Sequence, residues 1–314
     1  MKTQPGAANA FAVEELSSDF GFYLRTTGVL AEHRSPMQHI EIVQTPLFGR
    51  TMRIDGCFMT SEGDEFFYHE PMVHLPAITH GAPRQALIIG GGDGGSAHNL
   101  LRYPCMERVV LAELDGAVIE MARQWLPAVH RGAFDDPRLE IHLGDGMAYL
   151  QSCARSFDQI VLDLTDPFGP AVALYTRDFY RACQRALRPG GVVSLHVQSP
   201  IHLGPLMARI VASLQSVFGI VRPYLQYVPL YGTLWGMAMA SDAADPMLLS
   251  ADEVDARLAQ HGINDLKLYN GATHHGLLAL PPFVQHLLAQ NARPIDVGEE
   301  LLEPPHVGYR LVRE

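Results

Sequence analysis

The segment Ala86-Leu-Ile-Ile-Gly-Gly-Gly-Asp-Gly-Gly95 decides the fold of this chain. A short apolar run rich in isoleucine is typical of a buried strand, and the glycines that follow it end that strand. The next residues, 96–102, are compatible with a helix. In this order of strand, turn and helix, the spacing Gly90-x-Gly92-x-x-Gly95 predicts a nucleotide-binding turn.

Asp93 narrows the interpretation of this turn. A dinucleotide site holds a pyrophosphate on backbone N–H groups, and a carboxylate at that place would repel the phosphates. An acidic turn suits a cationic nucleoside better, such as a sulfonium compound of the S-adenosylmethionine kind. The segment therefore predicts a nucleoside site for a positively charged ligand.

Strand and helix patterns alternate after residue 84, which indicates an α/β fold with a doubly wound, Rossmann-like parallel sheet of the class I methyltransferase type. Ligands bind such sheets beyond the carboxyl ends of the strands. A closing pair of strands is expected within residues 228–241. The expected strands span residues 86–89, 109–113, 139–143, 160–163 and 192–196, and the helices between them span 115–125, 146–151 and 177–187.

The segment before this alternation has a β pattern. Residues 20–62 contain partly alternating apolar runs with turns at 45–49 and 55–56, and residues 70–78 favour a helix that leads into the sheet. We therefore expect two domains: a small N-terminal antiparallel β domain over residues 1–76, and a nucleoside-binding catalytic domain over residues 77–314.

Composition excludes several classes of protein. The 314 residues carry a net charge of −11, which disfavours nucleic acid as a partner and is compatible with cationic substrates. The four cysteines form no C-x-x-C pair, so that no structural zinc site is expected, and their low number fits a reducing compartment. Because the sequence shows neither a signal-peptide pattern nor about 20 consecutive apolar residues, we expect no membrane partner and a cytoplasmic location.

Acidic residues follow the expected strands. Glu113 stands where a carboxylate accepts the hydroxyls of a ribose, although a solvated acid at a strand end would look the same. Asp145 could accept from an adenine amino group, with Gly146 allowing close approach, or could form an ordinary Asp-Gly turn. Asp163 and Asp166 could bind a metal, or could serve as a base and a cation anchor. No third cluster of metal ligands accompanies them, so that we expect no metal.

A second acidic segment, Asp64-Glu-Phe-Phe-Tyr-His-Glu70, lies at the expected domain junction. Junctions are favoured ligand sites, but acids at the start of a helix are also common because they suit the helix dipole. The two tryptophans, Trp125 and Trp235, are interpreted as core residues.

Together these segments resemble the polyamine aminopropyltransferases, the spermidine synthase family. General S-adenosylmethionine methyltransferases share the sheet but lack the Asp-Glu-Phe…Tyr-His segment and the Asp-x-x-Asp-Pro-x-Gly-Pro loop. The small β domain also fits the family. The matching stretches are Gln38, 49–56, 64–70, 90–95, 113–115, 135–138, 145–146, 163–170 and 229–231.

The resemblance implies transfer of the aminopropyl group of decarboxylated S-adenosylmethionine to putrescine or a related amine, which gives spermidine or an analogue and methylthioadenosine. It implies no cofactor, because the nucleoside is a co-substrate, and a homodimer or homotetramer. The alternatives are a methyltransferase on the same sheet and a polyamine-binding protein without catalysis.

The same resemblance implies a role for each matching residue. Asp163 would be the base that deprotonates the attacking amine, and Tyr68 would help to hold that amine. Asp93 would hold the aminopropyl ammonium group. The polyamine path would be lined by His69, Asp166 and Tyr231, and the nucleoside pocket by Gln38, Glu113, Asp145, Gly146 and Pro170.

The chain departs from the family pattern mainly on the acceptor side, which leaves the acceptor open among putrescine, cadaverine, agmatine and a longer amine. The presumed reactive residues are all present. The departures are Met37, Met59, His98, Asn99, Val172, Leu230, His196 and Gln198.

Overall fold

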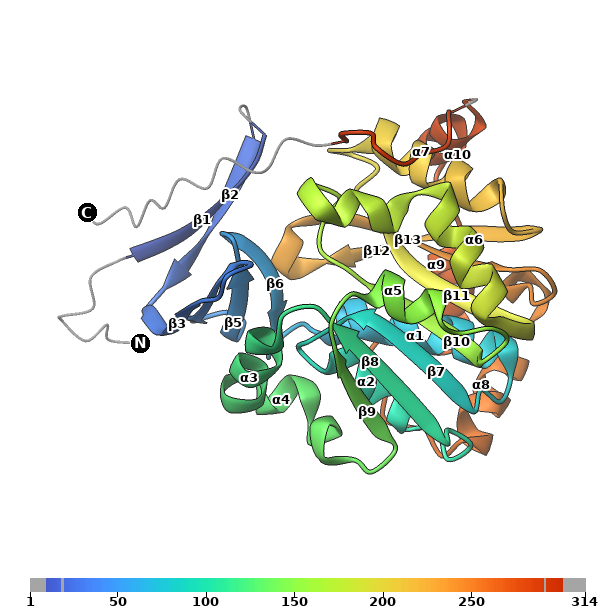
Figure 1. Cartoon of the computed structure of the whole chain (residues 1–314), viewed down its shortest axis with the longest axis horizontal. Helices are drawn as coiled ribbons and strands as arrows, with labels where there is room; N and C mark the ends of the chain where they lie inside the picture. The colour runs from blue at the N-terminus through green and yellow to red at the C-terminus, as the bar shows by residue number, and fades with distance from the viewer. Residues whose placement is uncertain (1–9, 18–19, 291, 302–314) are drawn as a thin grey trace.

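The computed structural model describes residues 10–17, 20–290 and 292–301 (Figure 1). The parts of the two expected domains that fall on residues 1–9, 18–19, 291 and 302–314 lie outside the described residues. Across the described part of the chain, no helix is long and apolar enough to cross a membrane.

A seven-stranded sheet forms the centre of the large domain. Its first five strands in sequence run parallel, and the last two, a hairpin, add to it in antiparallel fashion. This confirms the predicted α/β fold. In spatial order the strands are β12 (Ile220–Val228), β13 (Thr233–Ser241), β11 (Leu187–Gln198), β10 (Phe157–Asp163), β7 (Gln85–Gly90), β8 (Arg108–Glu113) and β9 (Leu139–Leu143).

The strand order reverses between β7 and β10. From β7 the chain moves to β8 and β9 on one side, and then returns to β10 on the other. In a doubly wound sheet this switch point opens a crevice at the carboxyl ends of the two strands, where ligands bind. Those ends are the glycine turn after Gly90 and the acidic loop that begins at Asp163.

The closing hairpin begins earlier than expected. The pattern placed a strand pair within residues 228–241, whereas β12 already starts at Ile220. Pro223 lies inside β12, and a proline argues against a central strand. The proline is compatible with β12 because β12 is an edge strand of the sheet.

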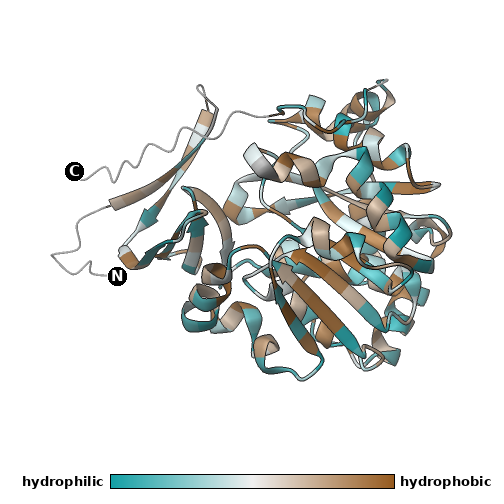
Figure 2. Ribbon diagram, viewed as in Figure 1, coloured by the Kyte–Doolittle hydropathy of each residue, from teal (hydrophilic) through white to brown (hydrophobic). Residues whose placement is uncertain are grey.

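Helices cover both faces of the sheet. Because successive side chains of a strand point to opposite faces, Ile88 packs in one core cluster and Ile89 in the other. Figure 2 shows the strands of the sheet as mainly apolar. The helices are α1 (Phe66–His80), α2 (Gly95–Leu101), α3 (Gly116–Trp125), α4 (Pro127–His130), α5 (Gly146–Gln151), α6 (Arg177–Ala186), α7 (Gly204–Gln215), α8 (Ala251–Gln260), α9 (Gly271–Leu278) and α10 (Pro282–Ala289), with the 3-10 turns η1 (Ala133–Asp135), η2 (Gly169–Tyr175), η3 (Pro229–Tyr231) and η4 (Pro246–Leu248).

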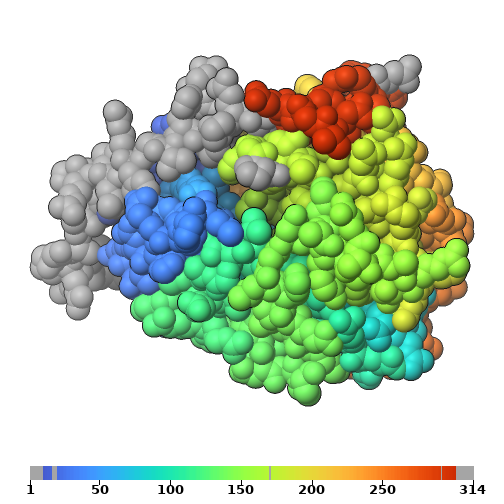
Figure 3. Space-filling model, viewed as in Figure 1, coloured from blue at the N-terminus to red at the C-terminus, as the bar shows by residue number. Residues whose placement is uncertain are grey.

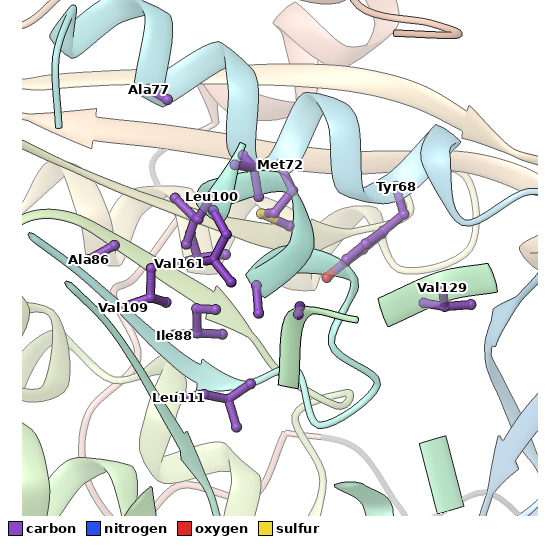
Figure 4. Packing of buried hydrophobic residues seen from close by; sticks show 14 of the residues in the cluster. Tyr68, Met72, Ala77, Ala86, Ile88, Leu100, Val109, Leu111, Val129 and Val161 are labelled. Carbon is purple, nitrogen blue, oxygen red and sulfur yellow. The ribbon is translucent and has the colours of Figure 1, made fainter. Parts of the chain in front are cut away.

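Helix α1 joins the two domains. Most of it was expected in the small domain, yet it packs against β10, β11 and β12 of the large sheet. Its residues Met72 and Ala77 belong to the same buried cluster as Ile88 and Val161 (Figure 4). Tyr68 extends from α1 at one edge of this cluster. The packing therefore favours a domain boundary just before α1.

The small domain consists of two antiparallel sheets at one end of the molecule (Figure 1). One is the hairpin of β1 (Ala10–Ser17) and β2 (Phe20–Thr26), and the other contains β3 (Gly28–Arg34), β4 (His39–Thr45), β5 (Gly49–Ile54) and β6 (Cys57–Ser61). Figure 3 shows the surfaces of the two domains in contact. Hydrogen bonds cross this contact: for example, Ser35 Oγ donates to Asp115 Oδ2 at 2.6 Å, and Arg50 Nη1 donates to the carbonyl oxygen of Trp125 at 3.1 Å.

Candidate active site

The glycine turn lies directly against the end of β10. Gly90 and Gly91 have φ values of 77° and 67°, and the N–H of Gly91 donates to the backbone carbonyl of Asp163 at 2.9 Å. A Cβ on Gly90 would lie 2.2 Å from that carbonyl oxygen. Glycine is therefore needed here both for the left-handed backbone and for the close approach of the two strand ends. This contact brings Asp93 and Asp163 together.

His69 is held between two carboxylates. Its Nδ1 lies 3.1 Å from Glu65 Oε2, and its Nε2 lies 3.4 Å from Asp93 Oδ2. Burial alone would lower the pKa of His69, but the charge of Asp93 and the hydrogen bonds to both carboxylates raise it well above its usual value. His69 is therefore a buried imidazolium at neutral pH, with both ring nitrogens as donors. Gly95 leaves room for the ring, because a Cβ there would lie 2.2 Å from His69 Cε1.

Glu65 has a second cationic partner. Arg131 Nη2 lies 2.9 Å from Glu65 Oε1, and the Arg131 side chain is 38% exposed. Four charges therefore alternate in sign from the surface to the crevice, in the order Arg131, Glu65, His69 and Asp93. In such a chain each buried charge has an opposite neighbour, which is the condition under which charges are tolerated in an interior.

Asp93 and Asp163 have opposite pKa shifts. Burial and the charge of Asp93 raise the pKa of Asp163, although the charge of His69 and hydrogen bonds from Ser96 and Tyr68 counteract this rise. Burial also penalises ionised Asp93, but the charge and hydrogen bond of His69 hold its pKa below the usual value. Neighbouring carboxyls whose pKa values are pushed apart are typical of a division between a fixed charge and a proton acceptor. The structure therefore suits Asp93 to the first role and Asp163 to the second.

His69, Asp93 and Asp163 form a cluster of polar side chains at the switch point, and Tyr68 completes it. Burial and the charge of Asp163 raise the pKa of its hydroxyl well above 10, so that the hydroxyl stays protonated and donates to Asp163. The ring of Tyr68 packs edge to face on Tyr231 at a centroid distance of 6.2 Å. Tyr231 is itself fixed, because its hydroxyl donates to the carbonyl oxygen of Met59 at 2.7 Å.

The cluster has the donors for a small cation. His69, Asp93 and Asp163 each offer one atom, and these atoms lie within 4.8 Å of one another. A protonated histidine has no free lone pair for a metal. With His69 as an imidazolium, the two carboxylates are better suited to an ammonium group than to a metal ion.

A pocket adjoins the cluster, with Tyr68 in its lining. On one wall, Gln198 Nε2 donates to Asp166 Oδ1 at 2.9 Å. On another, Glu14 Oε2 accepts from the backbone N–H of Phe58 at 2.6 Å, and burial raises the pKa of Glu14 to about 8. The lining residues come from both domains and are Glu14, Cys57, Phe58, Met59, Tyr68, Leu164, Thr165, Asp166, His196, Gln198, Ser199, His202, Leu203, Tyr231, Thr233 and Trp235.

Trp235 packs against the core and also contacts the pocket. It packs against the buried cluster beneath α1, as a core residue would, but it also lines the pocket and stacks on His196 at a centroid distance of 5.5 Å. Its indole Nε1 is buried without a hydrogen-bond partner among the described residues. Trp235 therefore packs against the core as expected and also forms part of the pocket wall.

The carboxyl ends of β8 and β9 form the other side of the crevice. Glu113 is buried at the end of β8, its Oε1 accepts from the N–H of Asp115 at 3.0 Å, and burial raises its pKa to about 7. A Cβ on Gly92 would lie 2.8 Å from Glu113 Oε2, so that the glycine turn and this carboxylate touch. Gln38 lies near this edge, because its N–H donates to Ser35 Oγ and Ser35 donates in turn to Asp115.

Asp145 and Gly146 begin helix α5. Asp145 Oδ1 accepts from the N–H of Met147 at 2.8 Å and thereby caps the helix. A Cβ on Gly146 would lie 2.5 Å from Ile89 Cγ2, so that only glycine allows α5 to start against β7. The backbone of Pro170 belongs to η2, but its side chain lies outside the description.

Nine of the eleven predicted residues, all but Gln38 and Pro170, thus fall into three groups. Tyr68, His69, Asp93 and Asp163 meet at the switch point; Asp166 and Tyr231 line the pocket with Tyr68; and Glu113, Asp145 and Gly146 lie at the ends of β8 and β9. His69, expected along the polyamine path, is absent from the described residues that line the pocket and instead contacts Asp93.

Sequence reasoning gave no role to four residues that take part in this site: Glu14, Glu65, Ser96 and Arg131. For Glu65 a signal existed, since it precedes His69 by four residues, the spacing at which helical side chains meet. Glu14 and Arg131 reach the site only through tertiary packing, and no local pattern marks them.

Two further departures from the family pattern, Asn99 and Leu230, form hydrogen bonds near the site. Asn99 Oδ1 accepts from His74 Nε2 at 2.9 Å, and Asn99 Nδ2 donates to the carbonyl oxygen of Gly95 at 2.9 Å. Leu230 donates its N–H to Asp64 Oδ2 at 2.7 Å. Both contacts connect the segments that carry the site.

Comparison with known proteins agrees with this arrangement. Residues 65–249 match the family model of the spermine/spermidine synthase domain, and residues 11–62 match that of the spermidine synthase tetramerisation domain. A polyamine aminopropyltransferase of Nitrosomonas europaea is 75% identical over 305 residues, which cover 96% of this chain and 94% of the relative. A polyamine aminopropyltransferase of Moorella thermoacetica is 40% identical over 271 residues, which cover 86% of this chain and 93% of the relative.

Solved structures show the same likeness. A spermidine synthase in complex with the transition state analogue AdoDATO has a TM-score of 0.83 and 35% identity, over 88% of this chain and 94% of that chain. The spermidine synthase of Thermotoga maritima has a TM-score of 0.81 and 34% identity, over 88% and 93%. These relatives do not favour the methyltransferase or the non-catalytic alternative. The chain belongs to the spermine/spermidine synthase family of polyamine aminopropyltransferases.

Proposed function

We propose that this chain transfers the aminopropyl group of decarboxylated S-adenosylmethionine to a diamine of the putrescine class and releases methylthioadenosine. The observation that carries this proposal is the pair Asp93 and Asp163, whose pKa values are shifted in opposite directions at the switch point of the sheet. The carboxylate of Asp93 is suited to binding an ammonium group, and that of Asp163 is suited to accepting a proton.

The donor would bind across the ends of β7, β8 and β9. Glu113 would accept the ribose hydroxyls, and Asp145 with Gly146 would face the adenine, with Gln38 and Pro170 completing the nucleoside pocket. Asp93 would bind the ammonium of the aminopropyl arm. His69 supports this role, because its contact with Asp93 Oδ2 at 3.4 Å keeps the carboxylate ionised.

Asp163 would remove a proton from the attacking amine. An alkylammonium has a pKa of about 10.4, so that only about one molecule in a thousand is neutral near pH 7.4, a cost of about 4 kcal/mol. A carboxylate with a raised pKa accepts the proton more readily than an ordinary one. Tyr68, whose hydroxyl donates to Asp163, would orient the carboxylate and the amine beside it.

The reaction then needs no acid for its leaving group. The amine nitrogen forms a bond to the methylene carbon, the carbon–sulfur bond breaks, and its electron pair stays on sulfur, which leaves as a neutral thioether. The proton of the amine passes to Asp163. Both substrates are cationic, and the carboxylates Asp93, Asp163 and Asp166 would offset their repulsion in a crevice where charge interactions are strong.

The acceptor would occupy the pocket beside Tyr68. Asp166 and Tyr231, with Gln198 on the same wall, would bind the distal ammonium. The buried Gln198 Oε1 has no hydrogen-bond partner among the described residues and is free to accept from it.

We also propose that the chain assembles into a homodimer or homotetramer through its N-terminal sheets and acts in the cytoplasm. The match of residues 11–62 to the tetramerisation domain supports the first statement. All four cysteines are free, which supports a reducing compartment. Sedimentation of the purified chain would test the assembly.

The function is tested by incubating the purified chain with decarboxylated S-adenosylmethionine and, separately, putrescine, cadaverine, agmatine and spermidine. Mass spectrometry would follow methylthioadenosine and the aminopropylated product. We expect both products with at least one diamine, and none with S-adenosylmethionine, whose extra carboxylate would face Asp93. A folded chain that binds methylthioadenosine but forms no product with any amine would refute the proposal.

A further inference from the structure

Ser96 is the first residue after the glycine turn to contact the reaction centre through its side chain. It is the second residue of α2 and is fully buried. Its hydroxyl donates to Asp163 Oδ2 at 2.7 Å. We propose that Ser96 is a positioning residue for the aminopropyl transfer, and that its hydrogen bond fixes the rotation of the Asp163 carboxylate and sets the pH range over which this carboxylate acts as the base.

The geometry leaves Oδ2 little freedom. Oδ2 accepts from Ser96 and also lies close to the backbone of Gly91, since a Cβ added to Gly91 would lie 2.9 Å from it. An ionised carboxylate has a second oxygen with its own acceptor sites. Because Oδ2 is engaged with α2, we infer that Oδ1 is the oxygen that receives the proton of the amine.

The hydrogen bond also bears on the protonation of Asp163. A donor to a carboxylate favours the ionised form, and the Ser96 hydroxyl accordingly counteracts the rise in pKa that burial and Asp93 impose on Asp163. The other titratable groups that face Asp163 come from α1, from the turn after β7, from η2 and from η3. They are Tyr68, His69, Asp93, Tyr175 and Tyr231.

These other groups do not replace Ser96. Tyr175 donates its hydroxyl to the backbone carbonyl of Thr165, and Tyr231 donates to that of Met59. His69 is engaged by Glu65 and Asp93. Ser96 and Tyr68 are therefore the hydroxyl groups in the described part of the chain that donate to Asp163.

The first test measures the rate of the chemical step against pH in a single turnover, with putrescine saturating and enzyme in excess over decarboxylated S-adenosylmethionine. This arm rests on the proposed function. In Ser96→Ala the acidic limb of the profile should move up by about one to two pH units, the shift that loss of a hydrogen bond to a charged group produces. Ser96→Thr, which keeps the hydroxyl, should have its acidic limb at the same pH as the natural chain.

Two controls separate this effect from general damage. The affinity for methylthioadenosine should stay unchanged in both variants, because Ser96 would not touch the nucleoside. Ser194→Ala removes another fully buried serine, whose hydroxyl has no hydrogen-bond partner among the described residues, and it should leave the limb in place. An unmoved limb in Ser96→Ala, or an equal shift in Ser96→Thr, would overturn the proposal.

A second test needs no turnover. The folded pKa of Asp163 is raised above its unfolded value of 3.8, so that ionisation of Asp163 costs stability as the pH rises through the folded pKa. Ser96 offsets part of this cost only when Asp163 is ionised. The drop in thermal midpoint caused by Ser96→Ala should therefore grow from pH 5 to pH 9, and should be independent of pH in an Asp163→Asn background.

The stability test also distinguishes failure of this inference from failure of the proposed function. A pH-dependent coupling between Ser96 and Asp163 in a chain that transfers no aminopropyl group would leave the contact established and would refute the transfer. Normal turnover with no such coupling would refute the role of Ser96 alone. If Ser96→Ala does not fold, Ser96→Cys serves instead, because its thiol keeps the shape but donates weakly.

Discussion

Replacement of Asp163 by asparagine should slow the aminopropyl transfer by a factor that follows from the pKa of the amine. Asparagine keeps the shape of the side chain but cannot accept a proton, so that only the neutral fraction of the amine can react. With an ammonium pKa of about 10.4, that fraction is about one in a thousand at pH 7.4. We therefore expect the rate of Asp163→Asn to fall about a thousandfold, within the range of about 10² to 10⁴ known for general bases.

The loss should shrink as the pH rises. Each pH unit multiplies the neutral amine about tenfold, so that the rate of Asp163→Asn should rise about tenfold per unit between pH 7.5 and 9.5, while the natural chain changes little. Methylthioadenosine formation, followed by mass spectrometry at saturating putrescine, measures this slope. Affinity for methylthioadenosine measured on the same samples shows whether the donor site survives the substitution.

A matched control lies on the same strand. Asp158 is buried at the start of β10, where its Oδ2 accepts from the N–H groups of Arg84 and Gln85 at 2.8 and 2.9 Å. Asp158→Asn should lower the thermal midpoint of unfolding. Its transfer rate should change as little between pH 7.5 and 9.5 as that of the natural chain. An Asp163→Asn variant that retains more than a tenth of the natural rate at pH 7.5, or whose deficit is the same at every pH, would contradict the assignment of Asp163 as the base.

Three further predictions follow from contacts in the site. Gly95→Ala places a Cβ where His69 now lies, and should lower both the thermal midpoint and the affinity for decarboxylated S-adenosylmethionine; unchanged values would show that the ring can move aside. Putrescine binding at pH 7 should release a proton from Glu14, because a nearby ammonium would lower its pKa from about 8. Calorimetry in two buffers with different ionisation heats measures the number of protons released, and this number should fall in Glu14→Gln. Arg131→Gln should weaken donor binding several-fold at low salt and less at high salt, because Arg131 is partly exposed; a loss that ignores salt would exclude a charge effect.

The sequence contained enough to predict the central part of the fold. The apolar run before Gly90 and the strands at 109–113 and 160–163 were found because buried parallel strands are short, apolar and ended by turns. The strand at 139–143 is largely exposed at the edge of the sheet, and it was found from the alternation of strand and helix patterns. The acids at their ends then share one edge by topology alone. The start of β12 was missed because Pro223 is compatible with a strand only at an edge, and the position of a strand in the sheet is a tertiary property.

The site was predictable where it follows strand ends and unpredictable where it depends on packing. Tyr68 and Asp163 meet because α1 crosses the end of β10, and their types suggested chemistry in advance. Ser96 is an ordinary helix residue until the fold places its hydroxyl 2.7 Å from a carboxylate. Arg131 lies in a loop with φ of 44°, and its contact with Glu65 cannot be read from either segment.

The two substrates would be served by different parts of the molecule. Most of the residues proposed for the donor lie at the ends of β7, β8 and β9 or in the turns that follow, whereas half of the residues that line the pocket belong to β1, β6, β11 and β13. Tyr68 and the loop after Asp163 are where these two sets meet. Substitutions in the pocket walls, such as Met59, can therefore accumulate without disturbing the carboxylates at the switch point. An ancestral chain of this design could change the amine that it lengthens while the transfer chemistry is inherited intact.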